Sequence, residues 1–206
     1  ARAEIIVDML NLGAVRERYS KVLLVIVPKE TVNRQIQILD RAGLRLEKVV
    51  FPPEALSMHF GRVLEKDIKD ETVAIIHVDE AFTGFTITKD GKALFVRGIH
   101  IGSTQLAEDR EAYLDRFQDE LEKSLESYTT DEIGVAPKAG ILTGVFSQVP
   151  DMDEIISEAL EIPVRKQAYA ESFTFSDEAK QTVQSSGKSS FLNLLSTLSL
   201  AEKLKV

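Results

Sequence analysis

The chain has 206 residues, of which 44% are hydrophobic, and it contains no cysteine, so disulfides, thiolate zinc sites and cysteine nucleophiles are excluded. Its 25 lysines and arginines against 33 aspartates and glutamates give a net charge of −8, which argues against a nucleic-acid partner bound through its phosphate backbone. No apolar run approaches the roughly 18 residues of a membrane span and no basic-then-apolar leader opens the sequence, so we expect no direct membrane insertion.

The amino-terminal part predicts a helix, then a strand, then a second helix. Apolar residues at helical spacing predict the first helix over Ile5–Leu10. The continuous apolar run Val22–Val27, closed by Pro28, predicts a buried strand. Thr31 is expected to cap the second helix, and Gly43 to end it in a left-handed conformation.

A second strand is predicted over Arg45–Phe51, followed by a third helix over Glu54–Leu64 after two consecutive prolines. Three strands are then predicted over Thr72–Val78, Gly84–Lys89 and Ala93–Ile99. The Asp-Gly pair between the last two of them is a strong hairpin signal.

The carboxyl-terminal half alternates helices with short strands. The predicted elements, in order, are a long helix starting at Gly102-Ser103-Thr104, a strand over Ala139–Thr143, a helix after Pro150-Asp151, an edge strand over Ile162–Arg165, a polar loop over Thr174–Ser190 and a helix over Phe191–Lys205. The acidic face of the long helix is expected to be solvated surface. Composition and periodicity therefore predict a mixed α/β arrangement and do not choose a function.

The segment Ala74–Ile87 (A-I-I-H-V-D-E-A-F-T-G-F-T-I) brings two adjacent acids, Asp79 and Glu80, to the end of an apolar strand. Several nucleotide-binding folds hold a metal or a phosphate in this way, although two acids at a strand end are also ordinary surface residues. His77 lies within the strand and is expected to be a hydrogen-bonded core histidine. With His59 and His100 far away in sequence, the three histidines have no metal-ligand spacing.

Two further sequence patterns are not interpreted as ligand-binding sites. Ser186-Gly187-Lys188-Ser189 is similar to the end of a phosphate-binding loop, but Thr182 stands where its first glycine should be and no apolar strand precedes it. Asp151 and Asp153 are expected to serve the positive end of a helix.

Four blocks of sequence, in order, resemble the PilM-type proteins of bacterial type IV pilus machines, which have an actin-like ATPase fold. The blocks are V-L-L-V-I-V-P-K-E-T-V-N-R-Q-I-Q-I-L-D-R-A-G-L (Val22–Leu44), F-P-P-E-A-L-S-M-H-F (Phe51–Phe60), G-K-A-L-F-V-R-G-I-H-I-G-S-T-Q-L (Gly91–Leu106) and A-G-I-L-T-G-V-F-S-Q-V-P-D-M-D-E-I-I-S-E-A-L-E-I-P-V (Ala139–Val164). No single block is a strong motif, and the resemblance depends on the four blocks occurring in this order. It extends over most of the chain from about Ser20.

The resemblance implies an α/β fold in which residues 67–206 form an actin-like, ribonuclease H-like lobe with antiparallel hairpin strands and packed helices. Residues 1–66 would be part of a smaller α/β subdomain with its connecting helix. It also implies a cytoplasmic location, peripheral to the inner membrane, and a partner in the cytoplasmic tail of a PilN-like bitopic membrane protein. Nothing resembling the first phosphate loop of such folds is present, so it either lies outside this sequence or is lacking.

The resemblance also implies a nucleotide site, whose candidate residues are Asp79, Thr83, Gly84, Thr86, Gly102, Thr143 and Gly144. Asp79 matches the aspartate that would position magnesium-bound water. Ala81 stands where the second phosphate loop has a glycine, so a Cβ occupies the approach of the phosphate. Glu80 adds a second negative charge there, and Val145 replaces a glycine that borders the base. We therefore expect a vestigial site, with ATP binding impaired or absent.

Three functions are compatible with these observations. The favoured one is a scaffold without catalytic activity, of actin-like ATPase descent, in a pilus or related secretion platform. The main alternative is an active ATP- and Mg-binding protein of pilus assembly or cell division whose first phosphate loop lies outside this sequence. The third is a filament-forming relative that associates with itself.

Overall fold

The computed structural model describes residues 4–15, 19–63, 70–130, 135–146, 149–167 and 176–177. The chain divides into two compact units, Ala1–Phe51 and Pro52–Val206, and each is described by itself. The assignment of residues 1–66 and 67–206 to separate lobes of a larger protein stays a prediction. The predicted polar loop over Thr174–Ser190 and helix over Phe191–Lys205 lie outside the described residues, apart from Ser176 and Asp177.

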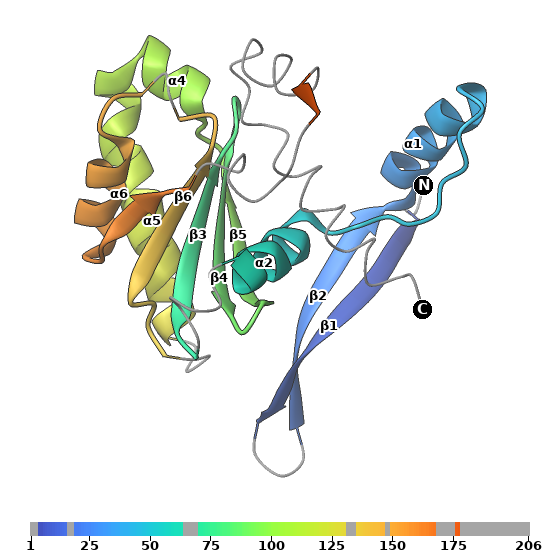
Figure 1. Ribbon diagram of the computed structural model, residues 1–206, viewed down its shortest axis with the longest axis horizontal. Coiled ribbons are helices and arrows are strands. Elements are labelled where there is room, and N and C mark those ends of the chain that lie inside the picture. Colours follow the sequence, from blue (N-terminus) through green and yellow to red (C-terminus); the bar gives the residue numbers. More distant parts are fainter. Residues whose placement is uncertain are drawn as a thin grey trace. The chain divides into compact units, whose positions relative to one another are not determined.

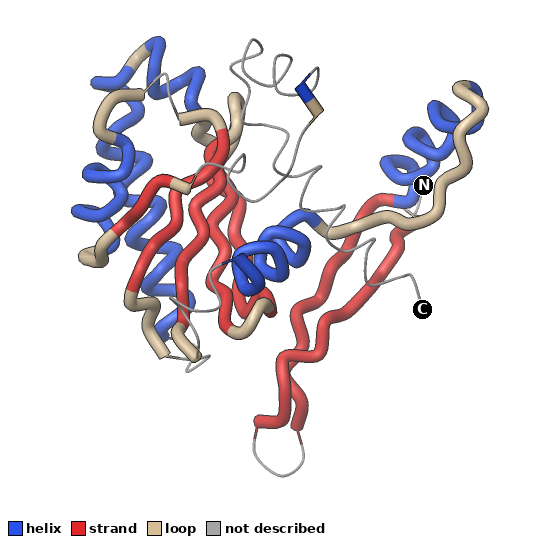
Figure 2. The backbone as a smooth tube through the Cα atoms, in the orientation of Figure 1, coloured by secondary structure: helices blue, strands red, loops and turns tan. Residues whose placement is uncertain are grey.

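The first unit is built on an antiparallel hairpin of β1 (Ile5–Val15) and β2 (Tyr19–Pro28), with an irregularity in the pairing between Asn11 and Gly13 (Figure 2). The helix predicted over Ile5–Leu10 is therefore wrong. Short apolar runs fit a period of either two or 3.6, and here pairing with β2 selects the strand. The strand predicted over Val22–Val27 is confirmed, but its predicted burial is wrong because its residues alternate between partly buried and exposed.

Helix α1 (Lys29–Arg41) begins directly after Pro28, so the predicted cap at Thr31 is wrong. Pro28 is the N-cap residue, with an extended ψ of 127° and no side-chain capping bond. The predicted end is confirmed: Gly43 has a φ of 70°, and its N–H bonds the Asp40 carbonyl at 3.0 Å. The N–H of Leu44 reaches the Leu39 carbonyl at 2.9 Å, which completes a Schellman motif.

The second strand predicted over Arg45–Phe51 is wrong, because these residues form no strand in the structure. An extended, apolar segment becomes a strand only where a neighbouring strand pairs with it. Among the described residues of this unit, β1 and β2 pair only with each other.

The second unit contains a five-stranded mixed sheet in the order β5-β4-β3-β6-β7 (Figure 1). Strands β3 (Thr72–Val78), β4 (Thr83–Lys89) and β5 (Lys92–Ile99) are antiparallel neighbours, while β6 (Ala139–Gly144) and β7 (Val164–Lys166) run parallel to β3. All five strands were predicted, with ends that differ by at most two residues. Asp90 and Gly91 both have positive φ, at 51° and 72°, as a two-residue type I′ hairpin requires.

Helices cover both faces of this sheet (Figure 1). Helix α2 (Pro52–Val63) packs on β4 and β5 and confirms the predicted third helix, while α4 (Ser103–Glu108), α5 (Arg110–Thr130) and α6 (Met152–Leu160) lie on the opposite side. The single long helix predicted from Gly102 is wrong because it is broken at Asp109. Asp109 leaves the helical conformation, and its carboxylate accepts the Ala112 N–H at 3.2 Å, so it caps α5.

The core lies where β3 is buried along its whole length. Ala74, Ile76 and Val78 face the helices α4–α6 and pack in one cluster with residues such as Phe117 and Tyr128. Because side chains alternate along a strand, Val73, Ile75 and His77 face the side of α2. A strand covered on both faces fixes the position of whatever follows its last residue.

We predict that Gly61→Ala destabilises the second unit. A Cβ at Gly61 would lie 2.6 Å from the Cα of Gly91, so α2 would have to move away from the turn between β4 and β5. We expect a loss of about 1–3 kcal/mol in the free energy of unfolding, although alanine favours a helix. Gly98→Ala is the matched control, since a Cβ at Gly98 meets nothing within 4 Å. Urea unfolding measures both; equal stability of the two variants would contradict the prediction.

Candidate functional site

The candidate site lies at the end of the sheet where β3 and β6 finish side by side. Val78, the last residue of β3, pairs with Thr83 of β4 and with Gly144 of β6. Three segments therefore meet there, which we call the sheet tip: the loop Asp79–Phe82, the segment Ile101–Thr104 that leads into α4, and Gly144–Val145. This is the place where sheets of this kind present ligand-binding groups.

Backbone hydrogen bonds close the loop onto the first residues of α4. The N–H of Ser103 donates to the Asp79 carbonyl at 2.9 Å, and the N–H of Thr104 donates to the Glu80 carbonyl at 3.1 Å. The N–H of Gly102 donates to the side-chain oxygen of Gln105 at 2.9 Å. The first N–H groups of a helix are the ones that a bound phosphate would accept from, and here the protein itself occupies them.

The two glycines of the tip are required by close backbone contacts. A Cβ at Gly102 would lie 2.5 Å from both the Asp79 and the Glu80 carbonyl oxygens. Gly144 has a φ of 98°, and a Cβ there would overlap the Val78 carbonyl. The next N–H, that of Val145, donates to the same carbonyl at 2.6 Å. Both glycines thus allow the segments of the tip to touch one another.

The acidic side chains of the tip differ in their surroundings. One carboxylate oxygen of Asp79 accepts the Glu80 N–H at 2.7 Å, and the Asp79 N–H donates to the Phe82 carbonyl at 2.8 Å. Glu80 and Ala81 are exposed. Among the residues that the structure describes, no group of three acidic or histidine side chains could hold a metal ion.

The structure brings most of the predicted site residues together, but it gives several of them structural contacts. Thr83 is fully buried and its hydroxyl donates to the Ile101 carbonyl at 2.8 Å. Gly84 and Thr143 both pair with His77, one residue back from the tip. Thr86 pairs with Ile75 inside the sheet, so it does not belong to the tip. The nucleotide-binding role of all seven residues stays a prediction.

Two residues at or next to the tip were not predicted as site residues. Gln105 bonds the Gly102 N–H and also donates to the Ala81 carbonyl at 3.5 Å, so it links the loop to the helix start. A polar side chain three residues after a helix cap is a recognisable signal for this role. Ser103 is fully buried, and its hydroxyl has no hydrogen-bond partner among the described residues. Sequence alone gave no signal for Ser103.

Other polar residues singled out in the sequence have structural positions. His77 is buried, as predicted for a core histidine; His59 is buried as well, and His100 is exposed. Asp153, in the first turn of α6, pairs with Lys166 at 2.6 Å, and that hydrogen bond is the main cause that lowers the pKa of its carboxyl. Asp151 is the N-cap residue of α6 but makes no side-chain capping bond.

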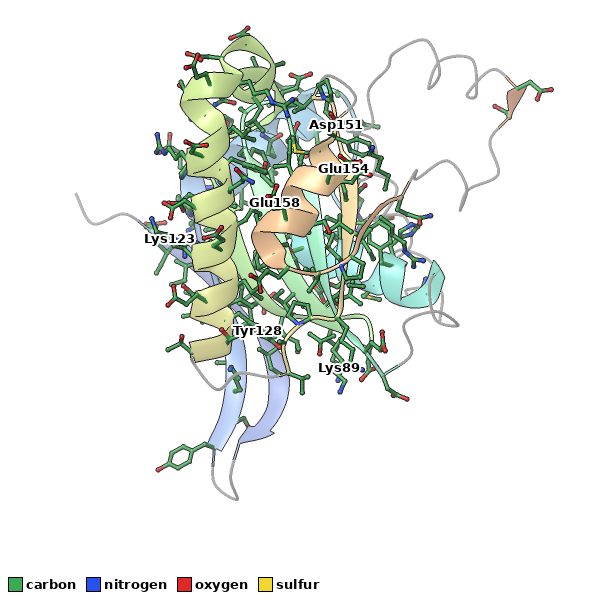
Figure 3. All side chains as sticks on the ribbon, turned by 90° about the vertical axis from the view of Figure 1, so that its left-hand side faces the viewer. Lys89, Lys123, Tyr128, Asp151, Glu154 and Glu158 are labelled. Atoms are coloured by element: carbon green, nitrogen blue, oxygen red, sulfur yellow. The ribbon has the colours of Figure 1, made fainter. Side chains whose placement is uncertain are left out.

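The acidic side chains along α4 and α5 are exposed or partly exposed, which confirms the solvated face predicted for the long helix. Figure 3 shows Asp151, Glu154 and Glu158 along α6, and all three are exposed. On α5, Lys123 pairs with Asp119 one turn away, and this hydrogen bond raises the pKa of the exposed lysine. None of the described helices combines the length and the apolar character needed to cross a bilayer.

The fold and the tip define a class: an α/β lobe with a mixed five-stranded sheet, whose central strand ends in a loop held between a helix start and a neighbouring strand end. The sequence profile of the family described as "Type IV pilus assembly protein PilM" matches residues 1–131. The chain therefore belongs to the PilM family of type IV pilus assembly proteins, which confirms the resemblance found in the sequence.

Solved structures support the fold class. The structure named "PilM-PilN type IV pilus biogenesis complex" superposes with a TM-score of 0.69 at 19% identity, covering 93% of this chain and 66% of that chain. The predicted α/β fold class is thereby confirmed. The chain spans 66% of the length of that relative.

Two further structures match less closely. A Bacteroides thetaiotaomicron protein with actin-like ATPase fold and unknown function has a TM-score of 0.43 at 15% identity, covering 81% of this chain and 55% of that one. The ethanolamine utilization protein EutJ from Carboxydothermus hydrogenoformans has a TM-score of 0.43 at 18% identity, covering 68% and 57%. No curated protein matches the chain.

We predict that the stability of the protein falls as the pH drops below the ordinary histidine pKa of 6.5, because burial lowers the pKa of both His77 and His59 in the folded state. The unfolded chain then binds more protons than the folded one, so acid favours unfolding. Urea midpoints at about pH 7.5 and about pH 5.5 measure the effect. His77→Gln should reduce the loss on acidification, whereas His100→Gln should leave it unchanged. A wild-type loss in the His77 variant would contradict the assignment.

Proposed function

We propose that the protein is a scaffold of a type IV pilus or related secretion platform, with a degenerate nucleotide site, that binds the cytoplasmic tail of a PilN-like bitopic membrane protein. It would act in the cytoplasm, held at the inner membrane through that partner. Membership of the PilM family and the fold shared with the PilM of a PilM–PilN complex support this proposal. One observation supports the proposal that the nucleotide site is degenerate. The N–H groups at the start of α4, which a phosphate would need, already donate to carbonyls of the loop after β3.

The hydrogen bonds of the tip weigh against a triphosphate. The N–H groups of Ser103 and Thr104 would have to release the carbonyls of Asp79 and Glu80 before they could reach a ligand. Each of these hydrogen bonds contributes about 0.5–1.5 kcal/mol, which would be lost unless water or the ligand replaced it. Glu80 adds a negative charge beside the same place, and it would repel a phosphate about 4–6 Å away. Both effects oppose binding in the same direction.

The proposed docking surface lies on the first unit, beside the start of α1. A shallow groove of about 460 Å³ is lined by Glu4, Pro28, Lys29, Glu30, Asn33, Arg34 and Gln37. The amides of Asn33 and Gln37 can bond the backbone of an extended tail, because amides both donate and accept. Arg34 lies 3.4 Å from Glu30 and is largely exposed, so it can exchange that weak pair for an acidic group of the tail.

An active ATP-binding protein is the second candidate, with its first phosphate loop outside this sequence. The observation in its favour is that Asp79, Gly102 and Gly144 meet at one sheet tip, as a nucleotide site would need. In that case, ATP with Mg²⁺ would be the cofactor of the intact protein, and the loop would open when the nucleotide binds.

We predict that Mg-ATP gives no saturable binding to the chain or to a version extended at its amino terminus, measured by calorimetry or by a shift in Tm. The matched variant is Asp79→Asn, which removes the carboxylate that the family resemblance assigns to a hydrated magnesium ion. Saturable binding that disappears in Asp79→Asn would refute the degenerate site and establish the second candidate.

We predict that a peptide with the first cytoplasmic residues of a co-encoded bitopic membrane protein binds the chain, and that Arg34→Glu weakens it by about tenfold. Charge reversal in the groove would repel an acidic group and disturb the amides beside it. Arg116→Glu is the matched control, because Arg116 is an exposed arginine of α5 in the other unit. Calorimetry gives the dissociation constants; no heat at high micromolar concentrations would count against the scaffold.

A further inference from the structure

Helices α4 and α5 are separated by a single residue, Asp109. Its φ of −144° and ψ of 73° are not helical, and Figure 2 shows the chain turning between the two helices. The residues on both sides of the break belong to types that favour helices: Ala107, Glu108, Arg110 and Glu111. The local sequence therefore favours one continuous helix, so contacts outside this stretch must keep it broken.

The break leaves N–H groups without the acceptors that a continuous helix would supply. In an unbroken helix, the N–H groups of Arg110, Glu111 and Ala112 would donate to the carbonyls four residues earlier. In the structure, the Ala112 N–H donates to the Asp109 carboxylate at 3.2 Å. The N–H groups of Arg110 and Glu111 have no protein acceptor among the described residues. The side chain of Asp109 therefore replaces part of what the break removes.

Contacts at the sheet tip stabilise the broken arrangement. Ser103 and Leu106 are fully buried, and Leu106 belongs to the core cluster of the second unit. The N–H groups of Ser103 and Thr104 donate to carbonyls of the loop Asp79–Phe82. A straight continuation of α5 would remove these residues from the loop. The hydrogen bonds of the tip and the break at Asp109 are therefore coupled.

We propose that α4 is a latch on the sheet tip, with Asp109 as its hinge. While the loop Asp79–Phe82 binds α4, the helix stays broken; when the loop releases α4, the latch rotates away from the tip and continues α5 as one helix. The two arrangements use the same backbone groups differently, so they are discrete alternatives. The latch couples the state of the tip to α5, a helix of 21 residues. It does not involve the groove of the first unit, so its failure would leave the proposed tail binding untouched.

Amide hydrogen exchange followed by NMR tests the latch on the 206-residue chain. In Gly102→Ala, a Cβ would lie 2.5 Å from two carbonyl oxygens of the loop, so the loop should release α4. We expect the Glu111 amide to exchange at least about threefold more slowly than in the wild type, because it gains the acceptor that a continuous helix supplies. Gly98→Ala is the matched control, since a Cβ there meets nothing within 4 Å; it should leave the rate unchanged. Unchanged or faster exchange of Glu111 in Gly102→Ala would show that a released α4 merely unfolds, and it overturns the proposal.

A second set of variants keeps Gly102 and changes the hinge. Asp109→Ala removes the capping carboxylate and places the best helix former at the break, so it favours the continuous helix. We expect the Ser103 and Thr104 amides to exchange about tenfold faster, while the amides of β3 keep their rates. Asp109→Ser, which can still cap α5, and Asp115→Ala, at an exposed position within α5, should both exchange like the wild type. Wild-type rates at Ser103 and Thr104 in Asp109→Ala, or the same acceleration in β3 or in Asp115→Ala, overturn the proposal.

Discussion

The close approach of Gly102 to the loop after β3 is the contact on which the sheet tip depends. Only a residue without a Cβ lets the carbonyls of Asp79 and Glu80 reach the first N–H groups of α4. Once these bonds form, the loop has one conformation, and the start of α4 is fixed relative to β3. The same contact gives hydrogen-bond acceptors to the first N–H groups of α4. An anion would have to bond those same N–H groups, so local stability and ligand binding compete for them.

The rest of the second unit holds this contact in place. Strand β3 is buried on both faces, and its last residue, Val78, is held by β4 on one side and by Gly144 and Val145 on the other. The loop therefore leaves from a position that cannot shift without disturbing the core. A site on such a support is either well formed for its ligand or closed, because packed cores do not deform continuously.

The strands of the second unit could be predicted because apolar runs or alternating apolar residues lie between turn residues, and Asp90-Gly91 is the sequence of a type I′ hairpin turn. Residues Ile5–Leu10 could not, since I-I-V-D-M-L fits a helix or a strand until β2 pairs with it. The break at Asp109 was hidden by helix-forming neighbours on both sides. At the tip, the family resemblance located the candidate positions. It could not show that the N–H groups at the start of α4 are already bonded to the loop, because those bonds depend on how closely two distant backbone segments approach.

The two units differ in how they obtain their stability. The second has a core on both faces of its sheet, whereas α1 has no buried residue and β2 alternates between partly buried and exposed positions. A unit with so little burial of its own opens at low cost, and whatever covers it adds its binding free energy to the folded state. Partner contacts on the first unit should therefore also order it. The scaffold that we propose would respond to its neighbours through this coupling of binding and folding.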